Sequence, residues 1–198
     1  MTSTPRWFTD TDDDHSDQYV AYIRELAAQN ADLAGEARLM DALMAPGSRV
    51  LDAGCGPGRV GAALHERGHQ VVGVDVDRIL IAAAVQDYPG PTWVVSDLVD
   101  MDLTFHGVTE PFDAAVLAGN VLAFVEAGTE SGALGGIARH LKPGARVAVG
   151  FQCERYAVAD FDRHLADAGF ILEQRFATWD LRPWHDDADF AVSILIWP

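Results

Sequence analysis

The chain has 198 residues, a formal net charge of −16 and a hydrophobic content of 49%. This size and composition fit one folded domain with a sizeable core. The acidic balance, with Lys142 as the only lysine, disfavours a nucleic-acid partner, because phosphate backbones are bound by clustered Lys and Arg.

The composition also indicates where the protein is located and whether it binds a metal. No apolar run approaches the ~20 residues that span a bilayer, and the first residues lack the apolar core of a signal peptide. We therefore expect a cytoplasmic protein with no membrane partner. Cys55 and Cys153 lack metal-ligand spacing, and the histidines are dispersed, so we expect reduced thiols and no metal site. The oligomeric state stays open.

Helices are predicted for the first part of the chain. Residues 1–15 are polar and acidic, and they indicate an arm that is either mobile or covers a ligand. Apolar residues then recur with helical spacing over 16–29 and again over 32–44. The dipeptide Pro46-Gly47 ends this region.

Strands and helices alternate from Ser48 onward, which is typical of a parallel sheet covered on both faces. The predicted strands are, in chain order, 49–53, 70–75, 92–95, 112–117, 146–151, 170–179 and 189–197. The predicted helices between them are 59–66, 77–87, 129–141 and 158–168. The turn-rich segment 182–188 makes a hairpin of the last two strands.

The most informative motif lies where the first strand ends. Asp52 closes this strand, and glycines follow at alternate positions, namely Gly54, Gly56 and Gly58. Glycine permits the backbone angles of a tight turn and leaves no Cβ between backbone and ligand. The next helix directs its first N–H groups toward this turn. The motif therefore predicts a nucleotide-type binding loop.

The spacing of the glycines distinguishes between ligands. A dinucleotide loop follows the pattern G-x-G-x-x-G. Here the third glycine comes one residue early, Arg59 occupies its expected place, and Asp52 would repel a pyrophosphate. A ligand with positive groups and no phosphate suits this loop better. Segment 50–58 resembles the first motif of the class I S-adenosylmethionine-dependent methyltransferases at every position.

This resemblance extends over roughly residues 48–197. It implies S-adenosylmethionine as cofactor and an α/β fold. The fold is a Rossmann-like doubly wound sheet of seven strands in the order 3-2-1-4-5-7-6, with the last strand antiparallel and N-terminal helices over the cofactor site. We expect residues 1–198 to form a single domain, in which 1–45 is the arm with its helices and 48–198 is the core sheet.

Ligands of open parallel sheets lie beyond the carboxyl ends of the strands, so the candidate residues are those at these ends. The predicted cofactor-binding residues are Asp52, Ala53, Gly54, Gly56, Gly58, Asp75, Val76, Ser96, Asp97, Leu98, Ala118 and Gly119.

Two carboxylates have the clearest predicted roles, each with an alternative. Asp52 would bind the methionine ammonium group, or it fixes the loop by accepting backbone N–H groups. Asp75 would accept hydrogen bonds from ribose hydroxyls, or it is a helix N-cap.

The next strand ends complete the predicted site. Val76 would supply an apolar wall for adenine. The resemblance implies that Asp97 accepts from the adenine amino group, with a turn-forming Asp as the alternative. Asn120 contacts the substrate or stabilises a turn. The sequence A-G-N-V at 118–121 departs from the N-P-P-Y type of motif, which disfavours methylation of nucleobase or protein amide nitrogens.

Candidates for the substrate pocket come from three segments near the strand ends, and His185 is the candidate base by its pKa class. The alternative is a solvent-exposed loop histidine. These candidates are Trp7, Phe8, Tyr19, Tyr22, Gln152, Cys153, Glu154, Arg155, Tyr156, Trp184 and His185. Methyl transfer from a sulfonium depends mainly on alignment, so no catalytic residue is assigned.

The sequence thus predicts a methyltransferase that acts on a small-molecule acceptor. One alternative is a methyltransferase-like protein that binds S-adenosylmethionine or S-adenosylhomocysteine without catalysis. Another is an NAD-type oxidoreductase, which the early glycine and Asp52 disfavour. The acceptor and its nucleophilic atom stay open.

Overall fold

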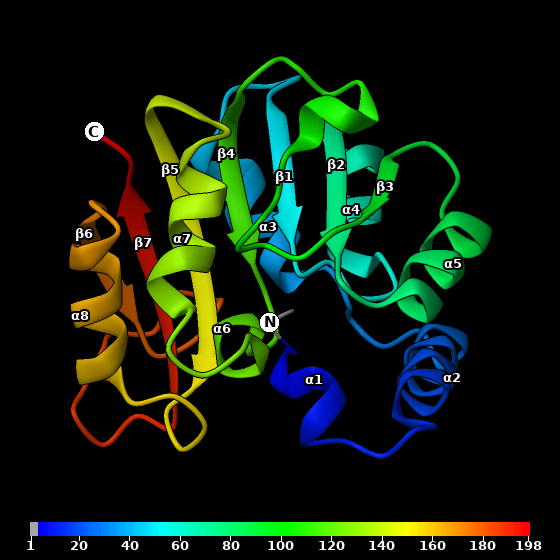
Figure 1. Cartoon of the computed structure of the whole chain (residues 1–198), viewed down its shortest axis with the longest axis horizontal. Helices are drawn as coiled ribbons and strands as arrows, with labels where there is room; N and C mark the ends of the chain where they lie inside the picture. Colours follow the sequence, from blue (N-terminus) through cyan, green and yellow to red (C-terminus); the bar gives the residue numbers. More distant parts are fainter. Residues whose placement is uncertain (1–3) are drawn as a thin grey trace.

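The central layer of the molecule is a seven-stranded sheet (Figure 1). The computed structural model describes residues 4–198. The strands lie in the order β3-β2-β1-β4-β5-β7-β6, which confirms the predicted fold class. Their bounds are β1 (Arg49–Ala53), β2 (Gln70–Asp75), β3 (Thr92–Val95), β4 (Phe112–Leu117), β5 (Leu141–Gln152), β6 (Ile171–Phe176) and β7 (Phe190–Ile196).

Strand β7 pairs antiparallel with both of its neighbours, and the other neighbouring strands pair in parallel. The central strands β1, β2 and β4 are apolar and largely buried, because helices cover both of their faces. The carboxyl ends of β1 to β5 consequently meet at one edge of the sheet, where a ligand of such a fold lies.

Helices lie on both faces of the sheet and beyond this edge. Their bounds are α1 (Arg6–Thr9), α2 (His15–Ala28), α3 (Gly35–Leu43), α4 (Arg59–Glu66), α5 (Arg78–Asp87), the 3₁₀ helix η1 (Leu103–His106), α6 (Val121–Phe124), α7 (Glu130–Ala138) and α8 (Val158–Asp167). Helices α3 and α4 cover one face, and α7 and α8 cover the other (Figure 1). Within residues 4–198, no helix has both the length and the apolar character that a membrane crossing requires.

The predicted elements exist, with shifted ends. Strand β5 begins at Leu141 rather than at 146, because Leu141 already pairs with Phe112 before an irregularity in the pairing around Lys142-Pro143-Gly144. Helix α7 accordingly ends at Ala138. The short helices α1, η1 and α6 were not predicted, since four residues make about one turn and show no periodicity.

The N-terminal segment covers the carboxyl ends of the strands. Helices α1 and α2 lie beyond that edge of the sheet (Figure 1). The buried carboxylate of Asp77 attaches both helices, because one of its oxygens accepts from Trp7 Nε1 at 2.7 Å and from the Ser16 hydroxyl. The other oxygen accepts from the Ile79 N–H at 2.7 Å and caps helix α5. We call residues 5–20, which include α1, the cover.

Replacing Asp77 by asparagine should release the cover selectively. The remaining carbonyl oxygen still caps α5, whereas the amide nitrogen cannot accept from Trp7 and Ser16. We expect the free energy of unfolding to fall by about 1–3 kcal/mol and amide exchange in α1 and α2 to accelerate.

Hydrogen exchange read by mass spectrometry, together with urea unfolding, measures both effects. Asp102→Asn is the matched control, because Asp102 caps η1 at an exposed position far from the cover. Unchanged exchange in α1 and α2 of Asp77→Asn would contradict the assigned attachment.

Candidate functional site

Three glycines shape the loop between β1 and α4. Gly54, Gly56 and Gly58 have φ angles of 73°, 54° and 90°, in the left-handed region that other residues rarely adopt. The N–H groups of Gly54 and Cys55 donate to the Val74 carbonyl at 2.8 and 3.0 Å. These bonds tie the loop to β2 and fix its path past the end of β1.

The indole of Trp93 on β3 packs against this loop. A Cβ atom at Gly58 or Gly61 would lie 2.9 Å from the ring, and one at Gly73 would lie 2.3 Å from it. The indole N–H donates to the Tyr88 carbonyl at 3.0 Å, which holds the ring in place. Gly61 and Gly73 were not predicted from the sequence, because their contact with Trp93 joins separate elements and leaves no local pattern.

Asp52 combines burial with a loop-fixing hydrogen bond. Its side chain is 1% exposed, and one carboxylate oxygen accepts from the Gly61 N–H at 2.8 Å. Burial raises the pKa of Asp52 to about 7, although the Gly61 N–H and the Arg59 guanidinium oppose this rise. A cation bound beside Asp52 would stabilise its charged form.

Asp75 at the end of β2 also holds the loop. One oxygen accepts from the Gly56 N–H at 2.8 Å, and the other accepts from the Asp77 N–H at 2.9 Å. Burial raises the pKa of Asp75 to about 6. The alternative role of Asp75 as a helix N-cap is wrong, because Asp77 occupies that position of α5.

A cavity of about 360 Å³ lies over the loop at the carboxyl ends of the strands. Most of the predicted cofactor-binding residues line it, namely Asp52, Gly54, Gly56, Asp75, Val76, Ser96, Asp97, Leu98, Ala118 and Gly119. Ala53 and Gly58 lie outside its walls: Ala53 is wholly buried in the core, and Gly58 packs against Trp93. The topology therefore brings residues from four strand ends to one chamber.

Asp97 lies in this wall and also forms a turn, because one of its oxygens accepts from the Val99 N–H at 2.8 Å. The turn-forming alternative is therefore present. It leaves the second carboxylate oxygen of Asp97 without a hydrogen bond among the described residues 4–198, so this oxygen can accept from a ligand.

The cover and α6 supply aromatic walls. The ring centroid of Trp7 lies 4.8 Å from that of His15, 6.1 Å from that of Tyr19 and 5.3 Å from that of Phe124. All four residues line the cavity. Trp7 and Tyr19 were predicted from the sequence. His15 and Phe124 were not, because His15 lies in an acidic stretch and Phe124 lies in a one-turn helix. Neither position carried a periodic signal.

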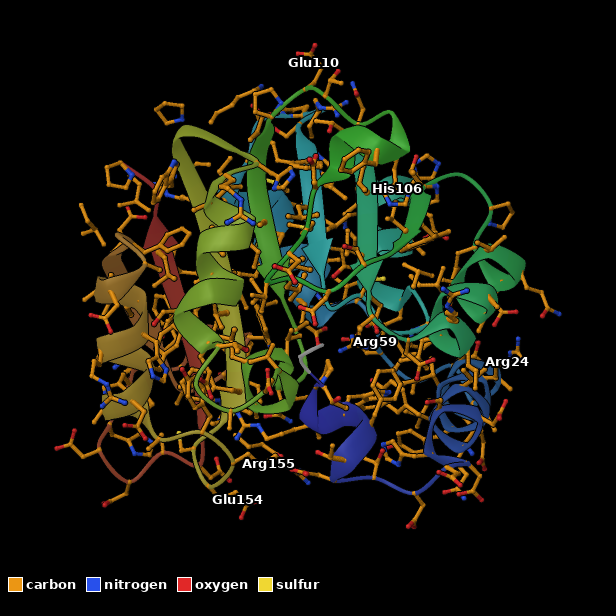
Figure 2. All side chains as sticks on the ribbon, viewed as in Figure 1. Arg24, Arg59, His106, Glu110, Glu154 and Arg155 are labelled. Carbon is orange, nitrogen blue, oxygen red and sulfur yellow. The ribbon has the colours of Figure 1, made fainter. Side chains whose placement is uncertain are left out.

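A second hollow of about 500 Å³ adjoins the first. His15, Phe124 and Arg155 line both hollows. Figure 2 shows Arg155 close to α1 at the carboxyl end of β5, whereas Glu110 lies at the opposite end of the sheet. The two hollows together offer room for a nucleoside-type ligand and a neighbouring small molecule.

The hairpin loop does not contribute to these walls, contrary to expectation. Trp184 packs on the apolar core, and the Arg175 guanidinium lies 5.5 Å from the centre of its ring. His185 is absent from the walls of both hollows, so its assignment as candidate base is not supported. Gln152 and Arg155, which follow β5, do line the first cavity as expected.

Comparisons with known proteins agree with this geometry. A family model described as "Methyltransferase domain" matches residues 50–144. A TehB-like SAM-dependent methyltransferase from Corynebacterium glutamicum is 39% identical, with 94% of this chain and 100% of that chain covered and a TM-score of 0.87.

More distant structures share the fold. The CcbJ methyltransferase from Streptomyces caelestis is 17% identical, with 84% and 95% of the two chains covered and a TM-score of 0.75. CalS10, an amino pentose methyltransferase from Micromonospora echinaspora, is 16% identical, with 90% and 97% covered and a TM-score of 0.71. A search among curated proteins gave no match.

The strand order and the glycine loop define a Rossmann-like methyltransferase domain. The chain belongs to the class I S-adenosylmethionine-dependent methyltransferase family, as its likeness to the Corynebacterium protein over nearly the whole chain shows. The cofactor of this family is S-adenosylmethionine.

The loop geometry makes Gly56 a sharp test of the site. A valine there would strain the left-handed backbone and place its side chain at the cavity wall, 3.5 Å from Tyr19. We expect Gly56→Val to lower the affinity for S-adenosylmethionine at least a hundredfold, which corresponds to about 3 kcal/mol.

Calorimetric titration with S-adenosylmethionine measures this affinity. Gly107→Val is the matched control, because Gly107 has a φ angle of 75° and no neighbour within 4 Å of an added Cβ. The Gly107→Val variant has similar backbone strain but away from the cavity, so it should bind S-adenosylmethionine with normal affinity. Normal binding by folded Gly56→Val would refute the loop assignment.

Proposed function

We propose that the protein transfers a methyl group from S-adenosylmethionine to a small-molecule acceptor held beside the cofactor. The observation that carries this proposal is the pair of adjoining hollows, which share His15, Phe124 and Arg155. The cofactor occupies the hollow over the glycine loop, and the acceptor occupies the second. The net charge of −16 supports a small acceptor over a nucleic acid. Residues 1–198 act as one domain, with the N-terminal part as its cover.

The walls of the first hollow fit the parts of S-adenosylmethionine. Asp75 accepts from the ribose hydroxyls, and Asp52 faces the methionine ammonium group. Gly54 and Gly56 leave the loop without Cβ atoms along this hollow, and a Cβ at Gly56 would contact the Tyr19 ring at 3.5 Å. A cation beside Asp52 would offset the unfavourable burial of a carboxylate.

The adenine and methionine parts are held by the remaining strand ends. Val76 and Leu98 supply apolar surface for the adenine ring, and Asp97 accepts from its amino group. Ser96 lies beside them. Ala118 and Gly119 directly follow β4 and carry a methyl group and no side chain, respectively, which lets the methionine part lie close to the backbone. All of these residues line the same cavity.

Alignment is the main contribution of the protein to the reaction. S-adenosylmethionine supplies an electrophilic methyl group whose leaving group is a neutral thioether, so no acid is needed. The walls orient the acceptor on a line with the methyl group and the sulfur, and such positioning supplies ~7–11 kcal/mol in favourable cases. The cover, through Trp7 and Tyr19, excludes water.

His15 is the group best placed to take a proton from the acceptor. It lines both hollows, and its ring nitrogens form no hydrogen bond with any of residues 4–198. Imidazole is the usual general base near neutral pH. An acceptor hydroxyl would need this help, whereas a neutral amine would not.

Turnover with small acceptors separates an enzyme from a non-catalytic cofactor-binding protein. We expect S-adenosylhomocysteine to accumulate when the wild type is incubated with S-adenosylmethionine and a panel of small phenols, thiols and amines. Asp75→Ala should stay folded but lose cofactor binding, and therefore turnover. Tight cofactor binding without turnover across the panel would favour the non-catalytic alternative, and tight binding of NAD would favour an oxidoreductase.

The raised pKa values of Asp52 and Asp75 predict how cofactor binding depends on pH. Both carboxyl groups are largely protonated in the empty site below pH 6, and the ligand favours their charged forms. Binding should therefore release protons, and the affinity should rise roughly tenfold or more between pH 5 and pH 7 and then level off.

Titration calorimetry in two buffers of different ionisation enthalpy measures this release. Without ligand, the folded state binds more protons than the unfolded state between about pH 4 and pH 7, so these two groups lower the free energy of unfolding as the pH rises. Asp52→Asn should reduce the proton release. An affinity that stays constant across this range would contradict the assigned contacts.

A further inference from the structure

Three arginines lie near the two hollows, and two of them are paired with a carboxylate. The guanidinium of Arg59 donates to both carboxylate oxygens of Glu36 and to the Leu33 carbonyl. The guanidinium of Arg6 donates to Glu130 and to the Val125 carbonyl, each at 2.8 Å. Arg59 links α4 to α3, and Arg6 links α1 to α7. The charge of each arginine is therefore paired with a carboxylate.

Arg155 differs from both, because its charge has no carboxylate partner. Its Nε donates to the Gln152 side-chain oxygen at 2.7 Å, and its guanidinium carbon lies 5.8 Å from the centre of the Phe124 ring. The two terminal nitrogens of Arg155 form no hydrogen bond with any of residues 4–198, and no carboxylate among these residues lies within 4 Å of them. An open guanidinium fork matches the two oxygens of a carboxylate.

A chain of hydrogen bonds holds Arg155 in this position. The Gln152 N–H donates to the Asn120 side-chain oxygen at 2.7 Å, and the Asn120 amide donates back to Gln152 at 3.3 Å. Asn120 lies three residues beyond the end of β4, where the methionine part of the cofactor would lie. Arg155 is exposed in the turn that follows β5, and this chain of hydrogen bonds ties its Nε to the sheet edge.

Charges around the second hollow limit what can bind to this fork. Asp10 and Asp12 also line the hollow, together with His15. These carboxylates oppose a ligand of several negative charges, whereas a single carboxylate bonded to the fork gains a charge-assisted hydrogen-bonded pair. Phe124, which lies under the guanidinium, offers apolar contact for the uncharged body of the ligand.

We propose that the methyl acceptor is an organic monocarboxylate, and that its carboxylate binds the open guanidinium fork of Arg155. This inference rests on the proposed function, because it assigns the acceptor class of the same chamber. The body of the acceptor lies against Phe124, with its nucleophilic atom directed toward His15 and the methyl group. Gln152 and Asn120 are positioning residues for this contact.

Binding rather than turnover provides the test. The protein saturated with S-adenosylhomocysteine is titrated with benzoate, 4-hydroxybenzoate, phenylacetate and cinnamate, and with the neutral amides of the same four acids. We expect at least one acid to bind about tenfold or more tighter than its amide, as a charged hydrogen-bonded pair implies. Arg155→Gln should abolish this preference, and Arg155→Lys should retain part of it.

Two further variants exclude a general effect of charge. Arg182→Gln removes the same charge from an exposed arginine outside both hollows and should keep the preference for the acid. Gln152→Glu is nearly isosteric and gives Arg155 an internal carboxylate, so it should weaken acid binding.

Equal affinities for acids and amides, an unchanged preference in Arg155→Gln, or no binding of any of the four acids at millimolar concentration would each overturn the inference. These outcomes are distinct from failure of the proposed function. If the cofactor binds and neutral acceptors are methylated, only the acceptor class is wrong. If acids bind through Arg155 but no acceptor is ever methylated, the anion contact stands and the methyltransferase activity does not.

Discussion

Two carboxylates at the ends of β1 and β2 hold the backbone of the glycine loop, and the geometry of the ligand-binding end depends on them. Asp75 accepts from the Gly56 N–H, and Asp52 accepts from the Gly61 N–H, so the middle of the loop and the first turn of α4 are fixed separately. A buried N–H that loses its acceptor costs about 1–3 kcal/mol. The same carboxyl groups line the cavity, so structural support and ligand contact use the same side chains.

The protonation of the carboxylates at the ligand-binding end of the sheet depends more on their burial than on the net charge of the protein. Asp52 is buried and Asp75 is partly buried, and desolvation is the main cause of their raised pKa values. Around them, Arg59 is already neutralised by Glu36. The empty site therefore favours a ligand that brings positive charge, which fits the sulfonium and ammonium groups of the family's cofactor and disfavours a pyrophosphate.

Much of the fold and part of the site could be predicted from the sequence, because their signals are local. The alternation of apolar strands and helices specified the sheet, and Asp52 with its three glycines specified the loop within ten residues. His15 and Phe124 could not be found this way, since they reach the chamber only through contacts between distant elements. Trp184 was misplaced for a related reason: it packs on the apolar core and contacts Arg175 of β6, and neither contact leaves a local signal in the sequence.

The attachment of the cover to Asp77 has a consequence for how ligands enter and leave the cavity. One oxygen of Asp77 caps α5 and the other retains Trp7 and Ser16, so the cover can lift while the helix end stays intact. Asp77 follows Asp75 by two residues, and the Asp77 N–H donates a hydrogen bond to the Asp75 carboxylate. Opening of the cover would require the bonds of Trp7 and Ser16 to Asp77 to break, so the strength of these bonds would contribute to the rate at which a ligand enters or leaves the cavity.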